Sequence, residues 1–331
     1  MEYRQLGTSG IRVPTVSLGA WAIGGWMWGG ADETEAIRAI HHALDIGMTC
    51  IDTAPVYGMG HSETVVGRAL AGGRRAKAII ATKCGLRWDR QDGEFYFDTR
   101  MPDGRPAKVY RNLRPESIRH ECEQSLKRLQ TDVIDIYQCH WPDSTTPIAD
   151  TMGTLLDLQK EGKIRAIGVS NFTPEMMAEC LRYGAIASDQ PPYSLLKRNI
   201  ERDVLPFCIE HTIGVLAYSP LAHGILTGKI PLEREFPEGD LRRTHPWFTR
   251  ENRRRILELL DKMRPSAENH GATLGQRAVA WVIAQQGVTS ALVGARSPAQ
   301  VEENARAGEI KLTDDESKRL RTLAEELTLE T

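Results

Sequence analysis

Eight short runs rich in β-branched residues recur along the chain, and segments with helical periodicity lie between them. This alternation limits the possible folds, because two parallel strands are joined only by a crossover of about a dozen residues or more, usually a helix. We therefore predict parallel strands whose outer side is covered by helices. The predicted strands are residues 15–18, 49–53, 78–83, 133–139, 164–170, 185–190, 213–219 and 289–294.

The segments between the strands carry helix start signals. Asp32, Ser62 and Thr173 open apolar periodic segments and are of the residue types favoured as N-caps, and a further helix is predicted at 114–130. A doubly wound sheet that binds a dinucleotide usually has GxGxxG after its first strand, whereas GAWAIGGWMWGG follows it here. Eight units without that motif predict an α/β protein with the (β/α)8 TIM barrel fold.

Four segments exceed what a minimal barrel needs. The first is the N-terminal stretch before residue 15, which we predict to be a hairpin across the bottom of the barrel. The others are an insert at 85–113, a segment at 220–270 and a final helix near 313–328. No break in composition divides the chain, so residues 1–331 are predicted to form a single barrel domain. The insert and the 220–270 segment both follow strands, on the barrel face where such enzymes place their chemistry.

Composition narrows the function classes. The 331 residues are 41% hydrophobic and 26% charged with a formal charge of −2, which is typical of a globular protein and does not favour nucleic-acid binding. The N-terminus lacks a secretion signal and no run of 18 apolar residues occurs, so we expect a cytoplasmic protein that does not enter membranes. The six cysteines form no CxxC pair, which predicts reduced thiols and no metal site.

Polar residues follow three successive predicted strands. Asp52, Lys83 and His140 lie at strand ends, and Tyr57 lies in the loop after the first of these strands. A tyrosine titrates near about pH 10, and a nearby lysine cation makes it a stronger acid. An aspartate would keep such a lysine charged, and a histidine could donate to a substrate oxygen. This set can protonate an oxygen but cannot supply a hydride, so a cofactor is required.

Six motifs occur in an order that resembles the aldo-keto reductase superfamily over nearly the whole chain. Within that superfamily the chain looks most like bacterial NADPH-dependent reductases related to potassium-channel β subunits. The resemblance implies a TIM barrel and NADPH-dependent reduction of aldehydes and ketones to alcohols. The motifs are IDTAPVYG (51–58), ATK (81–83), YQCHWPD (137–143), GVSNF (168–172), YSPL (218–221) and LVGARSPAQVEEN (292–304).

The resemblance also implies a role for each polar strand-end residue. Tyr57 would be the general acid, with Lys83 as its electrostatic partner. Asp52 would anchor Lys83, and His140 would orient the substrate carbonyl. No residue is implied as a metal ligand.

The cofactor contacts implied by the resemblance come from several strand ends. Ser170, Asn171 and Gln190 would hold the nicotinamide carboxamide, and Tyr218 would stack on the nicotinamide ring. Arg296 and Ser297 would bind a 2′-phosphate, since a guanidinium and a helix start both favour anions, and this favours NADP over NAD. The remaining implied contacts are Gly19, Trp21, Ser219, Leu221, Gly294, Gln300, Glu303 and Asn304.

Two other functions stay open on the sequence. The chain could be an NADP-binding regulatory or redox-sensing module with little turnover, as in the channel subunits. It could also be a lyase or aldolase that forms a Schiff base at Lys83, although the cofactor motifs argue against this. The substrate is a small carbonyl compound of unknown identity, and the oligomeric state is open. We expect a rather open apolar pocket, because few residues follow the last helix and several tryptophans fall near strand ends: Trp21, Trp26, Trp28, Trp88 and Trp141.

Overall fold

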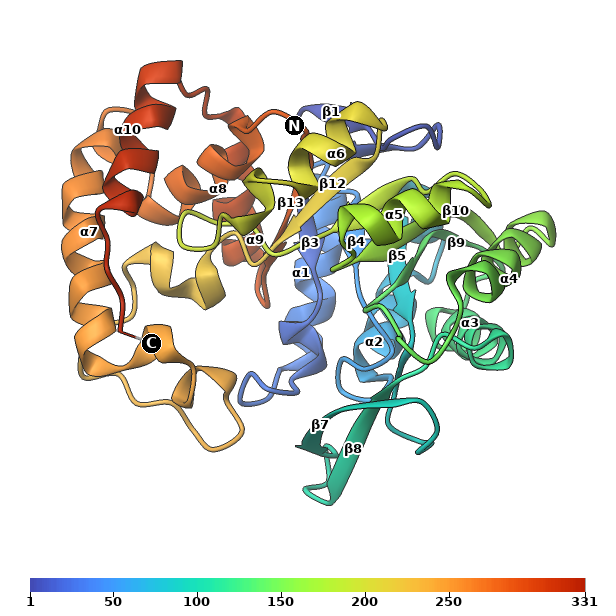
Figure 1. The fold of residues 1–331 in the computed structure, drawn as a ribbon. Coiled ribbons are helices and arrows are strands. Elements are labelled where there is room, and N and C mark those ends of the chain that lie inside the picture. The colour runs from blue at the N-terminus through green and yellow to red at the C-terminus, as the bar shows by residue number, and fades with distance from the viewer. Residues whose placement is uncertain (331) are drawn as a thin grey trace.

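The computed structural model describes residues 1–330, and in them eight parallel strands close into a barrel (Figure 1). The strands follow one another around the barrel in chain order, and β13 pairs with β3 to close it. This confirms the predicted fold, and each predicted strand forms with ends shifted by at most three residues. The strands are β3 (Val16–Gly19), β4 (Cys50–Asp52), β5 (Ile79–Cys84), β9 (Ile134–Cys139), β10 (Ile164–Ser170), β11 (Ser188–Gln190), β12 (Gly214–Tyr218) and β13 (Val288–Gly294).

Helices surround the barrel in the order that the alternation predicts. Asp32 and Thr173 cap helices as expected, each accepting a hydrogen bond from a backbone N–H of the first turn. The prediction for Ser62 is wrong: Gly60 is the N-cap, and the buried Ser62 hydroxyl donates to the carbonyl of Ala20 instead. The helices are α1 (Glu33–Asp45), α2 (His61–Leu70), α3 (Pro115–Leu129), α4 (Ile148–Lys160), α5 (Pro174–Leu181), α6 (Val204–Glu210), α7 (Arg250–Glu268), α8 (Leu274–Ala284), α9 (Pro298–Arg306) and α10 (Asp314–Glu325).

Apolar side chains form separate layers inside and outside the strands. The larger cluster fills the space between the strands and the surrounding helices. The smaller one lies inside the barrel, where Leu6 and Val13 of the N-terminal segment pack with inward residues such as Ile136 and Leu216. That segment pairs β1 (Tyr3–Gln5) with β2 (Arg12–Pro14), so the predicted hairpin forms and its apolar residues plug the bottom of the barrel.

The insert after β5 has regular structure that the sequence analysis did not assign. It is a three-stranded antiparallel sheet of β6 (Leu86–Arg87), β7 (Glu94–Arg100) and β8 (Pro106–Arg111), with β8 in the middle. In Figure 1 β7 and β8 extend from the end of the barrel opposite the N-terminal hairpin. The insert therefore stands on the face where the polar strand ends are found.

The 220–270 segment begins with short 3-10 turns and ends in α7. One turn covers Ala222–Thr227, and others cover Leu241–Arg243 and Pro246–Phe248. Helix α7 packs on α8 and α10, which places the last predicted helix against the 220–270 segment (Figure 1). Within the described residues, no helix is long and apolar enough to cross a membrane.

Candidate active site

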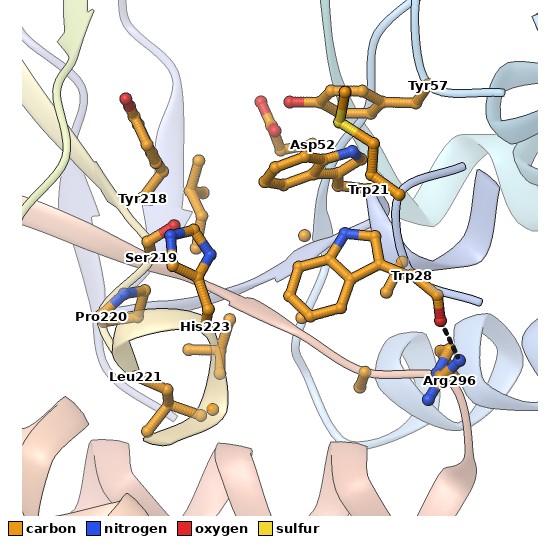
Figure 2. A pocket seen from close by; sticks show the side chains of 18 of the residues that line it. Trp21, Trp28, Asp52, Tyr57, Tyr218, Ser219, Pro220, Leu221, His223 and Arg296 are labelled. Carbon is orange, nitrogen blue, oxygen red and sulfur yellow. Dashed lines mark hydrogen bonds between the residues drawn. The ribbon is translucent and has the colours of Figure 1, made fainter. Parts of the chain in front are cut away.

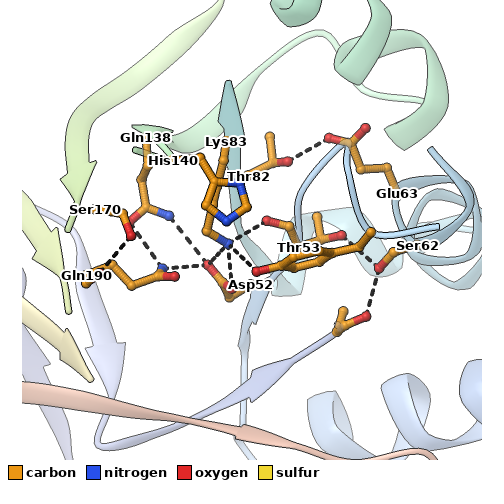
Figure 3. Close-up of polar contacts among 12 residues, drawn as sticks. Asp52, Thr53, Ser62, Glu63, Thr82, Lys83, Gln138, His140, Ser170 and Gln190 are labelled. Atoms are coloured by element: carbon orange, nitrogen blue, oxygen red, sulfur yellow. Dashed lines mark hydrogen bonds and ion pairs between the residues drawn. The ribbon is translucent and has the colours of Figure 1, made fainter. Parts of the chain in front are cut away.

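Four side chains predicted from three motifs come together at one rim of the barrel, and Figure 3 labels Asp52, Lys83 and His140 among them. Asp52 is the last residue of β4, Lys83 is the penultimate residue of β5, and His140 directly follows β9. Because parallel strands end on one side of a barrel, these residues share a face. Tyr57 reaches the same point from the turn between β4 and α2, and its ring lies edge-on to His140 at 5.7 Å between centroids.

The ammonium group of Lys83 is at the centre of the polar contacts. Lys83 Nζ donates to both carboxylate oxygens of Asp52 at 3.0 and 2.8 Å, and to the carbonyl of Thr53 at 2.9 Å. It also donates to the hydroxyl of Tyr57 at 3.3 Å. Lys83 is fully buried, and a buried ion pair persists only when hydrogen bonds satisfy its remaining polar atoms. The Asp52 and Thr53 contacts meet that condition and leave the cation beside the phenol.

Two glutamine amides complete the contacts of Asp52. Gln190 Nε2 donates to Asp52 Oδ1 at 2.8 Å, and Gln138 Nε2 donates to the same oxygen at 3.4 Å (Figure 3). Gln138 was not among the predicted site residues. It lies opposite Lys83 in the register of β5 and β9, and its spacing of two from His140 was the available signal for an inward side chain.

Burial sets the protonation states at this rim. It raises the pKa of Tyr57 well above its ordinary value, and the nearby Asp52 charge raises it further. It also lowers the pKa of His140 well below its usual range, with a smaller contribution from Lys83. Burial lowers the pKa of Lys83 as well, against the opposing effect of Asp52. At neutral pH the site therefore holds a protonated phenol and a neutral imidazole, both able to donate hydrogen bonds.

A cavity of about 590 Å³ opens above these groups (Figure 2). Of the predicted site residues, all line this cavity except Lys83 and Ser297. Lys83 lies beneath the surface and reaches the cavity through Tyr57. The Ser297 hydroxyl accepts from the backbone N–H of Gln300, so Ser297 is the N-cap of α9.

One part of the cavity wall is built around Asn171. Its backbone is left-handed with φ +61°, an uncommon conformation for a residue other than glycine. The side-chain amide donates to the carbonyl of His140 at 3.1 Å, and its oxygen accepts from the Tyr218 hydroxyl at 3.0 Å. The Ser170 hydroxyl donates to the carbonyl of Gln190 at 2.7 Å. These contacts fix the residues predicted to hold a nicotinamide.

The other end of the cavity lies at the start of α9, and its charged side chains are already engaged. Arg296 Nη1 donates to the carbonyl of Gly30 at 3.0 Å and to that of Trp28 at 3.5 Å, the second of which Figure 2 draws. Lys229 Nζ donates to both carboxylate oxygens of Glu303 at 2.8 and 2.6 Å. These contacts tie α9 to the loops that follow β3 and β12.

The insert sheet supplies an aromatic wall beside Tyr57. The rings of Trp26 and Phe97 stack at 6.2 Å, and the indole N–H of Trp26 donates to Thr99 Oγ1 at 3.1 Å. Tyr96 packs on Trp141 at 5.3 Å. Among the predicted tryptophans, Trp88 is not in the cavity lining and packs in the neighbouring apolar cluster.

Two features of the cavity lining suit a dinucleotide cofactor. Gly19 and Gly294 are paired across β3 and β13, so no side chain narrows the cavity there. Three buried polar atoms at its wall have no hydrogen-bond partner within residues 1–330: Trp21 Nε1, Trp28 Nε1 and His223 Nδ1. Buried polar groups without a partner are uncommon in native proteins, and a polar ligand would satisfy them.

The family model described as "Aldo/keto reductase family" matches residues 15–325. A protein named NADH-specific methylglyoxal reductase, from Escherichia coli, is 41% identical over 99% of both chains. Aldo-keto reductase YhdN of Bacillus subtilis is 39% identical over 98% of this chain and 94% of its own. Among solved structures, a glycerol dehydrogenase from Gluconobacter oxydans has a TM-score of 0.87 and 44% identity, over 98% of this chain and 95% of its own.

Proposed function

The chain belongs to the aldo/keto reductase family, and from that premise we propose that it is an NADPH-dependent oxidoreductase that reduces aldehydes and ketones to alcohols. The observation that carries this proposal is the contact between Lys83 Nζ and the Tyr57 hydroxyl at the floor of the cavity. A buried cation beside a phenol is suited to protonating an oxygen on which negative charge develops.

The proposed roles follow from the protonation states. A bound nicotinamide cofactor supplies the hydride. His140, neutral because of its lowered pKa, donates a ring N–H to the substrate carbonyl and orients it. Tyr57 then passes its proton to that oxygen, and Lys83 stabilises the phenolate that remains. Asp52 keeps the ammonium of Lys83 charged and directed at the phenol.

We propose NADPH as the preferred cofactor because of the charges at the start of α9. Arg296 precedes the N-terminus of that helix, where a guanidinium and the helix dipole both favour a phosphate. Arg296 Nη1 is held by backbone carbonyls, so a 2′-phosphate would meet the rest of the guanidinium or displace that contact. The Escherichia coli relative is named NADH-specific, which makes this preference a point to test directly.

The cavity wall supports a substrate class. Trp26, Phe97 and Trp141 line the cavity together with Tyr57 and His140 and present aromatic surface to it. We propose small aldehydes and ketones with an apolar or aromatic substituent, which such a surface binds by excluding water.

The test follows the absorbance of NADPH and NADH separately across aldehydes, ketones and sugars. We expect carbonyl-dependent oxidation of NADPH with a lower KM than for NADH. Arg296→Gln should raise the KM for NADPH roughly tenfold, because it removes a charge-assisted hydrogen bond to the 2′-phosphate. The KM for NADH should stay unchanged, since NADH has no 2′-phosphate. A lower KM for NADH in the native protein would contradict the NADPH proposal. Tight cofactor binding without turnover on any carbonyl would instead favour the redox-sensing module.

A further inference from the structure

A buried carboxylate behind the barrel wall contacts the end of β5. Glu121 lies on α3, and both of its carboxylate oxygens accept from the backbone N–H of Gly85 at 3.1 Å. Its Oε1 also accepts from the Ser117 hydroxyl at 3.2 Å. The side chain is almost fully buried, and Glu121 is not among the residues that line the cavity.

The peptide unit between Cys84 and Gly85 links Glu121 to two site residues, because its N–H contacts Glu121 and its carbonyl contacts His140. Gly85 follows Lys83 by two positions, and the carbonyl of the intervening Cys84 accepts from the backbone N–H of His140 at 2.9 Å. Gly85 has φ +91°, and a Cβ there would lie 2.5 Å from the Leu113 side chain. The turn therefore requires glycine at this position, and Glu121 accepts its N–H.

We propose that Glu121 is a positioning residue whose ionised carboxylate holds the Gly85 turn and, through that turn, the placement of Lys83 and His140. The inference rests on the proposed carbonyl reduction at these residues. Loss of the carboxylate charge weakens the hydrogen bond to Gly85, since a bond to an ionised acceptor is about twice as strong as one between neutral groups.

Glu121 changes charge in the range in which enzymes are assayed. Burial raises its pKa to about 7, and the Arg87 guanidinium, the Gly85 N–H and the Ser117 hydroxyl act in the opposite direction. Three further ionisable groups lie around Glu121. Asp89 belongs to the insert and pairs with Arg87. Cys84 on β5 and Tyr137 on β9 both have pKa values raised well above their ordinary range.

Two measurable properties should move in opposite directions with pH. Below the folded-state pKa of about 7 the neutral carboxyl holds Gly85 less firmly, so kcat falls as pH falls. Stability does the reverse. A carboxyl whose pKa is raised on folding binds its proton more tightly in the native state, so its contribution to stability falls as pH rises through the window from 4.5 to about 7.

Two site residues do not titrate in this window, because the pKa of Tyr57 lies well above it and that of His140 well below it. Asp189 on β11 also has a raised pKa, which burial brings to about 8. Asp189→Asn therefore serves as the matched control, a second buried carboxyl neutralised at almost constant shape.

The experiment compares kcat and Tm between about pH 6 and pH 8 for the native protein, Glu121→Gln and Asp189→Asn. We expect the native kcat to fall roughly tenfold toward the acidic end, the lower end of the range found for residues that orient the ligands of metal sites. In Glu121→Gln, kcat should be independent of pH and close to the value that the native protein has at the acidic end. The change of Tm with pH that Glu121 causes should be absent from this variant. Asp189→Asn should still show the fall in kcat below about pH 7.

An unchanged pH profile in Glu121→Gln overturns the inference. If that variant does not fold, the inference can still be tested on the native protein. A native kcat that is constant from about pH 6 to pH 8 also overturns the inference. Absence of turnover on every carbonyl would instead count against the proposed function. The pH dependence of Tm would then still show whether Glu121 titrates near neutrality.

Discussion

At the scale of single residues, Lys83 shows how much the sequence could reveal about the site. Asp52, Lys83 and His140 were predictable because each stands at a strand end, and strand ends of a barrel converge. Gln138 and Glu121 were not, since their importance lies in contacts to residues 86 and 36 positions away that only the folded chain brings together. The resemblance assigned Ser297 to a phosphate, and this stays a prediction, since a hydroxyl that accepts a capping hydrogen bond at the start of α9 can still donate one.

Neutralising Asp52 should change the pH dependence as well as the rate. In Asp52→Asn, Lys83 would lose its counter-charge while staying buried, so its pKa would fall further and it would lose its proton at lower pH. We expect the alkaline limb of kcat to move to lower pH, and a destabilisation of up to about 3 to 5 kcal/mol from the broken buried pair. Kinetic pH profiles and chemical denaturation measure the two effects.

Asp135 offers a matched control for that prediction. It is a buried carboxylate at the start of β9, paired with Arg75 at 2.8 Å and Arg165 at 2.9 Å. Asp135→Asn should destabilise the protein without moving the alkaline limb. A similar shift in both variants would mean that the pH profile reports general stability rather than Lys83.

At the scale of elements, regular periodicity decided what could be predicted. Most barrel strands lie in short runs rich in β-branched residues, so their existence was predictable and only their ends moved. The insert gave no such signal, because β7 has three aromatic residues in succession instead of an alternation, is partly exposed and carries a bulge between Phe95 and Phe97. The start of α2 was misplaced because Gly60, with φ +96°, takes the cap position that a serine usually occupies.

The insert sheet should set substrate preference through Phe97. Removing this ring in Phe97→Ala deletes the surface on which Trp26 stacks beside the cavity. We expect kcat/KM for aromatic aldehydes to fall roughly 10- to 200-fold, the range for a lost apolar contact in a substrate pocket, while the KM for NADPH stays unchanged. Phe95→Ala on the same strand is the control, since Phe95 is 49% exposed. Equal losses in both variants would contradict a specific role for Phe97.

At the scale of the whole molecule, the apolar cluster at the bottom of the barrel and the candidate active site lie at opposite ends. The N-terminal hairpin closes the bottom of the barrel, while the insert and the loop after β12 stand at the opposite end (Figure 1). We propose that residues 1–331 act as a single barrel domain. The alternation of strands and helices predicted this architecture, whereas the contacts between the loops depend on side-chain packing that no local pattern encodes.

Leu6 should matter for stability alone. It is fully buried in the cluster at the barrel bottom, so Leu6→Ala should leave a cavity that costs about 2 to 5 kcal/mol of unfolding free energy. We expect one unfolding transition in denaturant, with kcat and KM unchanged below it. Ile209→Ala, at a side chain that is 42% exposed, should change stability by less than about 0.5 kcal/mol. Separate transitions for different probes would contradict a single domain.

The central claim is that the Tyr57 hydroxyl, held beside Lys83, delivers the proton in carbonyl reduction. Tyr57→Phe removes that hydroxyl and keeps the ring against Trp21, whose centroid lies 5.8 Å away. The most direct measurement is single-turnover oxidation of bound NADPH by an aldehyde, alongside the Kd for NADPH. We predict a rate lower by about 10²- to 10⁴-fold with an unchanged Kd, as expected for loss of a general acid. A rate within about threefold of the native enzyme would contradict the claim.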